Sequence, residues 1–427
     1  MARFGVFCFP GTGHLNPMTA LARSLEQRGH EVVIFGIADS EAHVRAAGIE
    51  FHTIGAEDYP PGALQKLDDH LAQLKGFAAL RFTFERVKNS AQMELRDGPN
   101  AVRAANVDVL LVDEVDFAGN VADYLGLPWI SIAVIPPMVS DDRFPPFWFG
   151  WPAGQDRLSR LRNRLAMRVL LRLGSPIFAV VSQKRKSWGL APFKRPEDML
   201  SPLGQITQLP EALEFEIDGE KPAGLHYTGP FVHPGQRPAI NFPWHKLDGR
   251  PIIYASLGTL QNGSEALFRT IAEACAGLDA QLVMSLGGRL DPARLGKLAG
   301  DPLVMNFVPQ LEILKRAALV ITHAGINTVL ESLCEGVPFV AIPLGNDQPG
   351  MAARVKARGA CVVVPAHRLN AVRLRKALVQ VLQDVSYRAA AQALQKSLMQ
   401  IDGPGRAADL IEQVLKLRSA TAFSELV

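Results

Sequence analysis

The sequence has almost no net charge and no long apolar run, and each absence excludes a class of protein. Its 45 lysines and arginines are balanced by 42 aspartates and glutamates, whereas a chain that binds nucleic acid by bulk charge carries a clear basic excess. We therefore expect no nucleic-acid partner. No uninterrupted apolar stretch of about 18 residues occurs, so we expect no membrane-spanning helix. The apolar run at residues 1–9 is too short for a secretion signal, which favours a cytoplasmic protein.

The residues that usually form metal or redox sites are also sparse. The four cysteines are widely separated and have no histidine partner at zinc spacing. They are expected to be small buried side chains in a reducing compartment. Neither an Asp-x-Asp pair nor a histidine cluster occurs, so we expect no dedicated metal site.

What is present is an alternation of apolar β-branched runs with longer amphipathic stretches, which is typical of an α/β chain with parallel sheets. A chain of 427 residues is long enough for two or three domains at ~150 residues each. The predicted strands form two series: 4–9, 31–36, 107–112 and 129–135, with a helix over 17–29 in the first, and 251–257, 281–285, 319–322 and 339–342. The Pro- and Gly-rich segment 228–238 separates the series, and we place the domain boundary there, after residue 230.

Residues 157–196 break the charge balance, with eleven lysines or arginines and no acidic residue. Two stripes of period four run along one predicted helix: Arg160, Arg164, Arg168 and Arg172, and Leu161, Leu165, Val169 and Leu173. An aromatic-rich segment at 144–151 precedes them. We favour a leucine stripe that faces the core, with the arginines in solvent. The alternative is a contact of 144–172 with a membrane surface, where the protein would meet a lipophilic substrate.

The first candidate site follows the first predicted strand, at Gly11-Thr12-Gly13-His14. Glycines let the backbone approach a ligand, and a helix N-terminus favours negative charge. The dinucleotide-binding fingerprint fails because Asn16 occupies the third glycine position, and no Walker phosphate loop exists. His14 would face the cleft at the carboxyl ends of the strands, and its ordinary pKa suits a general base. A histidine that only caps or packs is an equally open alternative.

Asp113 is the candidate partner of this histidine. It follows a predicted strand of the same domain, and strand ends in one parallel sheet meet at one rim. A carboxylate on one imidazole nitrogen would fix the tautomer and stabilise the imidazolium. Glu114 and Asp116 compete for this role or are simply solvated acids.

The third candidate repeats the same design in the second domain, between a strand at 319–322 and a helix. Gly325 would admit an anion to the backbone, and Asn327 and Thr328 offer donors at the helix N-terminus. His323 can donate to a phosphate, and Glu331, one turn later, can accept from a ribose hydroxyl. A plain helix cap explains Asn327 and Thr328 but leaves His323 and Gly325 unexplained.

Several motifs together resemble the UDP-glycosyltransferase superfamily, glycosyltransferase family 1. They cover most of the chain and are weak only at 55–100 and 138–225, which in this family shape the acceptor pocket. The motifs are as follows: Gly13-His14-Leu15-Asn16-Pro17-Met18 through Arg28-Gly29-His30-Glu31-Val32, Thr228-Gly229-Pro230, Tyr254-Ala255-Ser256-Leu257-Gly258-Thr259, and the block 307–348. Among bacterial members, the chain is most similar to glucosyltransferases of carotenoids and other hydrophobic natural products.

The resemblance implies a GT-B fold and a role for each matching residue. The fold would comprise an acceptor-binding Rossmann-like domain at 1–230, a nucleotide-sugar-binding one at 231–405, and a C-terminal helix at 406–427 that packs back on the first. His14 matches the general base and Asp113 its partner acid. The donor-binding matches are diphosphate contacts, base contacts, a ribose contact and sugar contacts, in that order: Ser256, Gly258, Thr259, His323, Gly325, Asn327 and Thr328; Phe307 and Gln310; Glu331; Asp347 and Gln348.

Two departures from the family pattern concern the nucleotide. Phe307 and Ile326 stand where plant members have tryptophan, so UDP and dTDP both remain open as the donor nucleotide. Gln348 favours glucose in the family.

The implied reaction is an inverting, metal-independent and cofactor-independent transfer of a hexose, with glucose favoured. The donor would be a UDP-sugar, and the acceptor a hydroxyl of a small hydrophobic molecule such as a carotenoid, terpenoid or phenolic. The alternatives are a UDP-sugar epimerase of the same architecture and a non-catalytic partner subunit of a transferase.

Overall fold

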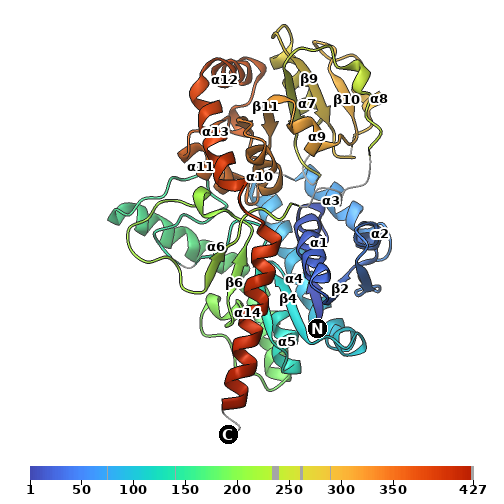
Figure 1. Cartoon of the computed structure of the whole chain (residues 1–427), viewed down its shortest axis with the longest axis vertical. Helices are drawn as coiled ribbons and strands as arrows, with labels where there is room; N and C mark the ends of the chain where they lie inside the picture. The colour runs from blue at the N-terminus through green and yellow to red at the C-terminus, as the bar shows by residue number, and fades with distance from the viewer. Residues whose placement is uncertain (75, 140, 233–239, 260–262, 289, 425–427) are drawn as a thin grey trace.

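The computed structural model describes residues 1–74, 76–139, 141–232, 240–259, 263–288 and 290–424, which form two α/β units (Figure 1). The first unit contains a seven-stranded parallel sheet of order β3-β2-β1-β4-β5-β6-β7. Its strands are β1 (Arg3–Phe7), β2 (Glu31–Gly36), β3 (Glu50–Thr53), β4 (Val109–Asp113), β5 (Trp129–Ala133), β6 (Gln205–Thr207) and β7 (Leu225–Tyr227). Its helices are α1 (Thr12–Gln27), α2 (Ala38–Ala46), α3 (Ala63–Gln73), α4 (Gly76–Ala104), α5 (Gly119–Leu125) and α6 (Arg157–Ser187).

The second unit contains a six-stranded parallel sheet of order β10-β9-β8-β11-β12-β13. Its strands are β8 (Ile252–Ser256), β9 (Gln281–Ser285), β10 (Leu303–Met305), β11 (Ala317–Thr322), β12 (Phe339–Ala341) and β13 (Cys361–Val363). Its helices are α7 (Glu265–Cys275), α8 (Pro292–Leu295), α9 (Gln310–Leu314), α10 (Ile326–Cys334), α11 (Gln348–Ala357), α12 (Ala371–Gln383) and α13 (Val385–Leu398). Helices cover both faces of each sheet, so the central strands are continuous apolar runs. The predicted α/β class with two Rossmann-like sheets is confirmed.

Helix α1 begins earlier than the sequence indicated. It starts at Thr12 rather than at Pro17, and therefore carries His14 in its first turn. Pro17 lies inside the helix and has no N–H to donate to the carbonyl of Gly13, four residues before it. That carbonyl is instead bound from the second unit, so the proline is tolerated where a helix normally excludes it.

The last helix, α14 (Gly403–Ser424), leaves the second unit and runs along α1 of the first (Figure 1). Ala407, Ala408 and Ile411 belong to the same apolar core as β1 and α1. Arg28 donates to Asp409 at 2.6 Å at the surface of this contact. The segment 228–238, where we placed the domain boundary, falls partly outside the described residues, as does the end of the predicted C-terminal segment, residues 425–427.

The predicted orientation of the leucine stripe in α6 is wrong. Leu161, Leu165 and Val169 are 47%, 49% and 59% exposed. The residues that α6 buries include Leu170, Gly174, Ile177 and Val181. They recur at mixed spacings of three and four, which follow the helical period of 3.6 better than a strict four-residue repeat. Within the described residues, α6 is also the one helix long and apolar enough to cross a bilayer.

Candidate active site

The first site lies at the carboxyl ends of β1 and β4, which are neighbours in the sheet. His14 stands in the first turn of α1, directly after β1, and Asp113 is the last residue of β4. His14 Nδ1 and Asp113 Oδ2 are 2.5 Å apart. Asp113 is fully buried, while His14 keeps 15% of its side chain exposed. The carboxylate therefore holds one ring nitrogen, and the other is available to a molecule in the cleft.

The electrostatic environment of His14 favours uptake of a proton. Burial alone would lower the pKa of the ring. The charge of Asp113, its hydrogen bond and the charge of Asp347 act in the opposite direction and together raise the pKa of His14 above 6.5. A base whose conjugate acid is stabilised in this way is suited to abstract a proton from a hydroxyl.

The two other acids of this segment serve different contacts. Glu114 accepts from the backbone N–H of Met138 at 2.9 Å and from the side-chain amide of Gln205. Burial, despite these hydrogen bonds, raises the pKa of Glu114 to about 8. Asp116 faces Glu94 instead, and neither competitor reaches His14 in the structure. The sequence left three acids open as the partner of His14, and Asp113 is the one that contacts it in the structure.

A large open cavity, with a volume of about 340 Å³, extends from His14 through the first unit. Most of its wall is apolar and aromatic, contributed chiefly by α4, α6 and residues 135–148. Members of this wall include Leu80, Phe84, Val87, Phe117, Phe144, Phe147, Trp148, Leu170, Ile177 and Phe178. Such a cavity suits a hydrophobic molecule whose polar group reaches His14.

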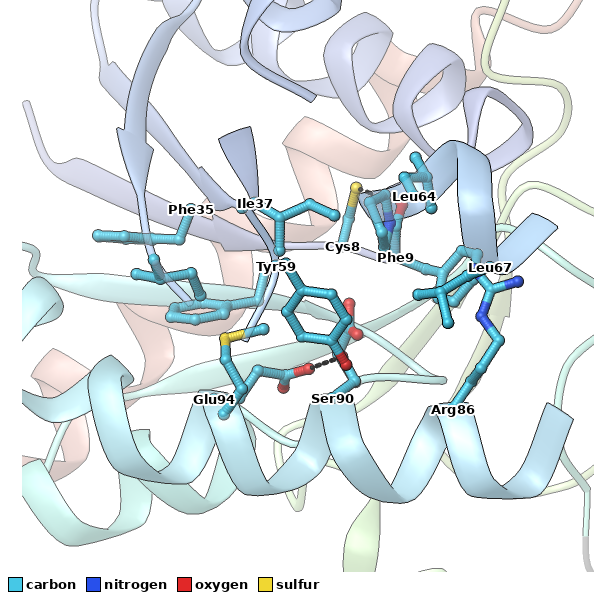
Figure 2. A pocket seen from close by; sticks show the side chains of 16 residues that line it. Cys8, Phe9, Phe35, Ile37, Tyr59, Leu64, Leu67, Arg86, Ser90 and Glu94 are labelled. Atoms are coloured by element: carbon cyan, nitrogen blue, oxygen red, sulfur yellow. Dashed lines mark hydrogen bonds between the residues drawn. The ribbon is translucent and has the colours of Figure 1, made fainter. Parts of the chain in front are cut away.

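A smaller side cavity of about 40 Å³ shares Phe9, Arg86 and Asp116 with the large one. Figure 2 shows Arg86, Ser90 and Glu94 projecting from one helix, α4, with Ser90 and Glu94 beside Tyr59 and Arg86 beside Leu67. Glu94 accepts from Ser90 Oγ at 2.9 Å and from the backbone N–H of Phe117 at 2.7 Å.

Both acids of the side cavity have raised pKa values, chiefly because of burial. Burial raises the pKa of Glu94 to about 7, in spite of its hydrogen bonds. Burial and the neighbouring charges of Glu94 and Asp113 raise the pKa of Asp116 well above its usual value. Within the described residues, Asp116 Oδ2 is buried with no hydrogen-bond partner. Glu94 could not be identified from the sequence, because its pairing with Asp116 joins a helix to a loop that is distant in the chain.

The second site lies at the carboxyl ends of β8 and β11, which are also neighbours. The ring of His323 fits between two glycines: a Cβ on Gly258 would lie 2.7 Å from it, and a Cβ on Gly325 2.5 Å. Burial lowers the pKa of His323 to about 4, although a hydrogen bond with the Ser256 backbone opposes the shift. His323 is therefore neutral, and both glycines are required by close approach. Thr259 follows Gly258 and is half-buried, like it.

Helix α10 presents its N-terminus to the same place. Its N-cap residue is Gly325, which has no side chain to accept from the backbone N–H groups of the first turn. Ala324, just before it, has the left-handed φ of 68°, which is uncommon for a residue with a Cβ. Strained turns of this kind gather at ligand sites, and no feature of the sequence pointed to this one. Thr328 is buried in the first turn.

Asn327 has a contact that sequence reasoning did not anticipate. Its Nδ2 donates to the carbonyl of Gly13 at 2.6 Å, and its Oδ1 accepts from Gln208 at 3.0 Å. The side chain thus joins α10 to the first turn of α1, whereas its backbone N–H stays at the helix N-terminus. The Gly13 carbonyl needs this partner because Pro17 supplies none.

The remaining donor-site residues lie around this helix end. Phe307 is 51% exposed and rests on Gly288, where a Cβ would lie 2.7 Å from its ring. The open ring can stack a planar base. Gln310 accepts from the Tyr254 hydroxyl at 2.9 Å and donates to Glu331 at 2.6 Å. The predicted base and ribose contacts are therefore hydrogen-bonded to each other in the structure.

Asp347 of the second unit lines the large cavity, as His14 of the first unit does. Burial raises the pKa of Asp347 to about 6, and the His14 charge partly opposes the shift. Gln348 accepts from the backbone N–H groups of Leu344 and Gly345 at 2.7 and 3.0 Å, so it fixes the turn that carries Asp347. Asn346 in this turn has a left-handed φ of 53°. No group of three potential metal ligands occurs among the described residues.

Comparison with known proteins gives two family models, which match separate parts of the chain. Residues 247–420 match the family model described as UDP-glucoronosyl and UDP-glucosyl transferase, and residues 7–99 match the glycosyltransferase family 28 N-terminal domain. The chain is 32% identical to a zeaxanthin glucosyltransferase from Pantoea ananas, over 97% of this chain and 96% of that protein. It is 30% identical to a protein of the same name from Pseudescherichia vulneris, over 97% and 98%.

A solved structure gives the same result in three dimensions. The glycotransferase of kitacinnamycin superposes with a TM-score of 0.74 at 25% identity, over 97% of this chain and 98% of that one. The predicted GT-B arrangement, in which two Rossmann-like units face each other, is confirmed by this likeness.

Proposed function

Because the chain belongs to glycosyltransferase family 1, whose members transfer a sugar from a nucleotide sugar to a small acceptor, we propose that it transfers glucose from UDP-glucose to a hydroxyl of a hydrophobic acceptor. The observation that carries this proposal is the His14–Asp113 pair, whose histidine lines an apolar cavity that is also lined by Asp347. The base, the acceptor space and a residue of the donor unit thus share one compartment.

The proposed chemistry is a direct displacement at the anomeric carbon. With Nδ1 held by Asp113, His14 Nε2 takes the proton of the acceptor hydroxyl, and the resulting imidazolium is stabilised by the carboxylate. The acceptor oxygen bonds to the anomeric carbon as the bond to the diphosphate oxygen breaks. UDP leaves with that electron pair, toward the N-terminus of α10, where partial positive charge and free backbone donors stabilise it. The sugar configuration is inverted.

No step of this scheme requires a metal. The helix end and the backbone around His323, Gly325 and Gly258 stabilise the negative charge of the diphosphate. Phe307 would stack the uracil, and Gln310 and Glu331 would exchange their mutual hydrogen bond for contacts to base and ribose. Asp347 would accept from sugar hydroxyls.

The acceptor we propose is a carotenoid or a molecule of similar hydrophobicity. The apolar and aromatic wall of the large cavity supports this choice, and so do the names of the two relatives given above. A mass-spectrometric screen of carotenoid, terpenoid and phenolic alcohols with UDP-glucose tests it. Transfer only to polar acceptors would contradict the proposal.

Loss of His14 tests the reaction itself. General-base assistance is worth ~10²–10⁴-fold, so His14→Ala is expected to lower kcat by about that factor while UDP still binds in calorimetry. His367→Ala, at an exposed histidine of the second unit, is the matched control. Full turnover in the His14 variant would refute the role of His14, and a non-catalytic partner subunit would tolerate its loss.

The donor is tested by competition in one assay. UDP-glucose is expected to outcompete UDP-galactose and dTDP-glucose. A win by galactose would refute the glucose preference, and a win by dTDP-glucose would refute the nucleotide. Release of free UDP only after acceptor is added would exclude an epimerase of the same architecture.

A further inference from the structure

The outward side of α6 carries a row of exposed apolar residues. Leu158, Leu161, Leu165 and Val169, which we call the outer face of α6, are 78%, 47%, 49% and 59% exposed. Single exposed leucines are ordinary on a protein surface, but four on successive turns of one helix are not. Figure 1 shows α6 at the side of the first unit, away from α14.

Arginines flank this row on every turn. Each of the four apolar residues has an arginine one residue before it on the chain: Arg157, Arg160, Arg164 and Arg168. Arg172 continues the series. Asp142 pairs with Arg160 and Arg164 at 2.6 and 3.0 Å, so one carboxylate serves two arginines. Arg168 and Arg172 have no ion pair with any described residue, and the surface keeps a clear excess of positive charge.

The opposite side of the same helix forms the wall of the large cavity. Leu170, Gly174 and Ile177 are buried there, and Gly174 lies against Phe84 of α4. A single helix therefore separates the outer face from the space that we assign to the acceptor.

The helix lies along this surface and does not leave the fold. Its length and composition would let it cross a bilayer, but both of its ends are tied to the first unit by buried polar contacts. Asn163 donates to the carbonyl of Asp142 at 2.9 Å, and Arg185 donates to Asp123 at 2.6 Å. Removal of these groups from their partners into hydrocarbon would be strongly unfavourable.

We propose that the outer face of α6 docks on the surface of a membrane that contains anionic phospholipids. The apolar residues enter the boundary between headgroups and acyl chains, and the arginines bind the phosphates, for which the planar guanidinium is well suited. The charge selects this occupant, because a symmetric contact with a second copy would bring two rows of arginines together. Delivery of a lipophilic acceptor from the bilayer into the cavity rests on the proposed function, whereas the docking itself does not.

Vesicle co-sedimentation of the full chain tests the docking. Binding is expected to vesicles of phosphatidylglycerol and phosphatidylcholine, to weaken in high salt, and to be lost with phosphatidylcholine alone. Each arginine near an anionic surface contributes about fivefold in affinity, so Arg168→Gln with Arg172→Gln is expected to weaken binding about 30-fold. Leu161→Ser with Leu165→Ser is expected to weaken it by a similar or larger factor. The matched control is Val372→Ser with Val385→Ser, at 79% and 80% exposed positions of the second unit, which should bind like the parent.

Three outcomes would overturn the proposal. The first is that the parent chain does not bind anionic vesicles, and the second is that the control variant loses binding equally. The third is that the chain does not bind vesicles and the leucine variant converts a dimer to a monomer, as seen by light scattering. The last would assign the face to a second copy. Transfer to a water-soluble phenolic acceptor should be unchanged in the leucine variant. If the parent binds vesicles but transfers no sugar, the proposed function fails and the docking stands.

Discussion

At the scale of single residues, the two histidines of the site are driven to opposite protonation states. Asp113, with help from Asp347, raises the pKa of His14, whereas burial lowers the pKa of His323 to about 4. The first ring is thus ready to accept and hold a proton, and the second stays neutral between its two glycines. The two rings differ in this way because His14 has a carboxylate partner, whereas burial dominates at His323.

Asp113→Asn tests the source of the His14 basicity. The variant keeps the size of the side chain but removes the charge that raises the pKa of His14. Turnover requires the neutral ring, so the acidic limb of the kcat/KM profile should move to lower pH. The plateau should fall by ~10²–10⁴-fold, because the imidazolium loses its stabilising partner. A profile of kcat/KM from about pH 5 to about pH 9 measures both effects.

Glu114→Gln is the control for this profile. Glu114 is the next residue in the chain and is also buried, but it contacts Met138 and Gln205 rather than His14. Its loss should leave the acidic limb in place. If Glu114→Gln moves the limb and Asp113→Asn does not, the catalytic partner has been assigned to the wrong acid.

At the scale of elements, the two helices that follow β1 and β11 are connected at their N-termini. Helix α1 carries His14, and α10 carries the helix end proposed for the diphosphate. The hydrogen bond from Asn327 to the Gly13 carbonyl connects their first turns across the two units. Pro17 has no N–H to donate to that carbonyl within the helix, so the carbonyl is available to Asn327.

Asn327→Ala is expected to separate catalysis from donor binding. It removes both hydrogen bonds of the side-chain amide; the one to Gly13, which joins the two units, is worth about 1 kcal/mol net, so kcat/KM should fall about fivefold. The backbone N–H of residue 327 stays at the helix N-terminus, so UDP affinity in calorimetry should be unchanged. Gln208→Ala, which loses the other contact of the Asn327 amide together with the hydrogen bonds of Gln208 to the backbone of Val134 and Phe231, serves as the comparison. A large loss of UDP affinity in Asn327→Ala would show instead that the side chain itself binds the diphosphate.

The elements also show what could be predicted from the sequence and what could not. Contact between His14 and Asp113 followed from strand ends alone, because β1 and β4 are neighbours in one parallel sheet. The contact of Asn327 with Gly13 could not be predicted, because it depends on how two separate units face each other. For α6, both stripes repeat every fourth residue, so periodicity could not decide which one is buried. The buried residues, such as Leu170 and Ile177, lie in neither stripe.

At the scale of the whole molecule, the interior of the first unit contains several acids that resist ionisation. Burial raises the pKa of Glu114 to about 8 and that of Glu94 to about 7, and it raises the pKa of Asp116 as well. All three lie near the carboxyl ends of the sheet, beside the proposed acceptor space. At neutral pH the cavity therefore carries fewer negative charges than its composition suggests, which suits an apolar ligand.

These acids make the fold less stable as the pH rises from about 6.5 to about 8. In the unfolded chain, the carboxyls have already lost their protons in this range, whereas the folded state still holds them. The free energy of unfolding therefore falls with pH, by at most about 1.4 kcal/mol per pH unit for each such proton. His14 acts in the same direction, because its raised pKa gives stability that is lost as the pH passes through the folded value. His323, with its pKa of about 4, acts in the opposite direction, but only below about pH 6.5, so it does not disturb this range.

Urea unfolding at a series of pH values between these limits measures the slope, and two variants assign it. Glu114→Gln removes one of the protons, so the slope should become shallower by up to about 1.4 kcal/mol per pH unit. Asp97→Asn is the control: the hydrogen bond from Arg96 holds the pKa of Asp97 below its usual value, so this group does not titrate in the range. Its loss should lower stability equally at every pH and leave the slope unchanged. A parent chain whose stability is constant or rises from pH 6.5 to 8 would contradict the protonated state of the buried acids, and with it the low charge that we assign to the cavity.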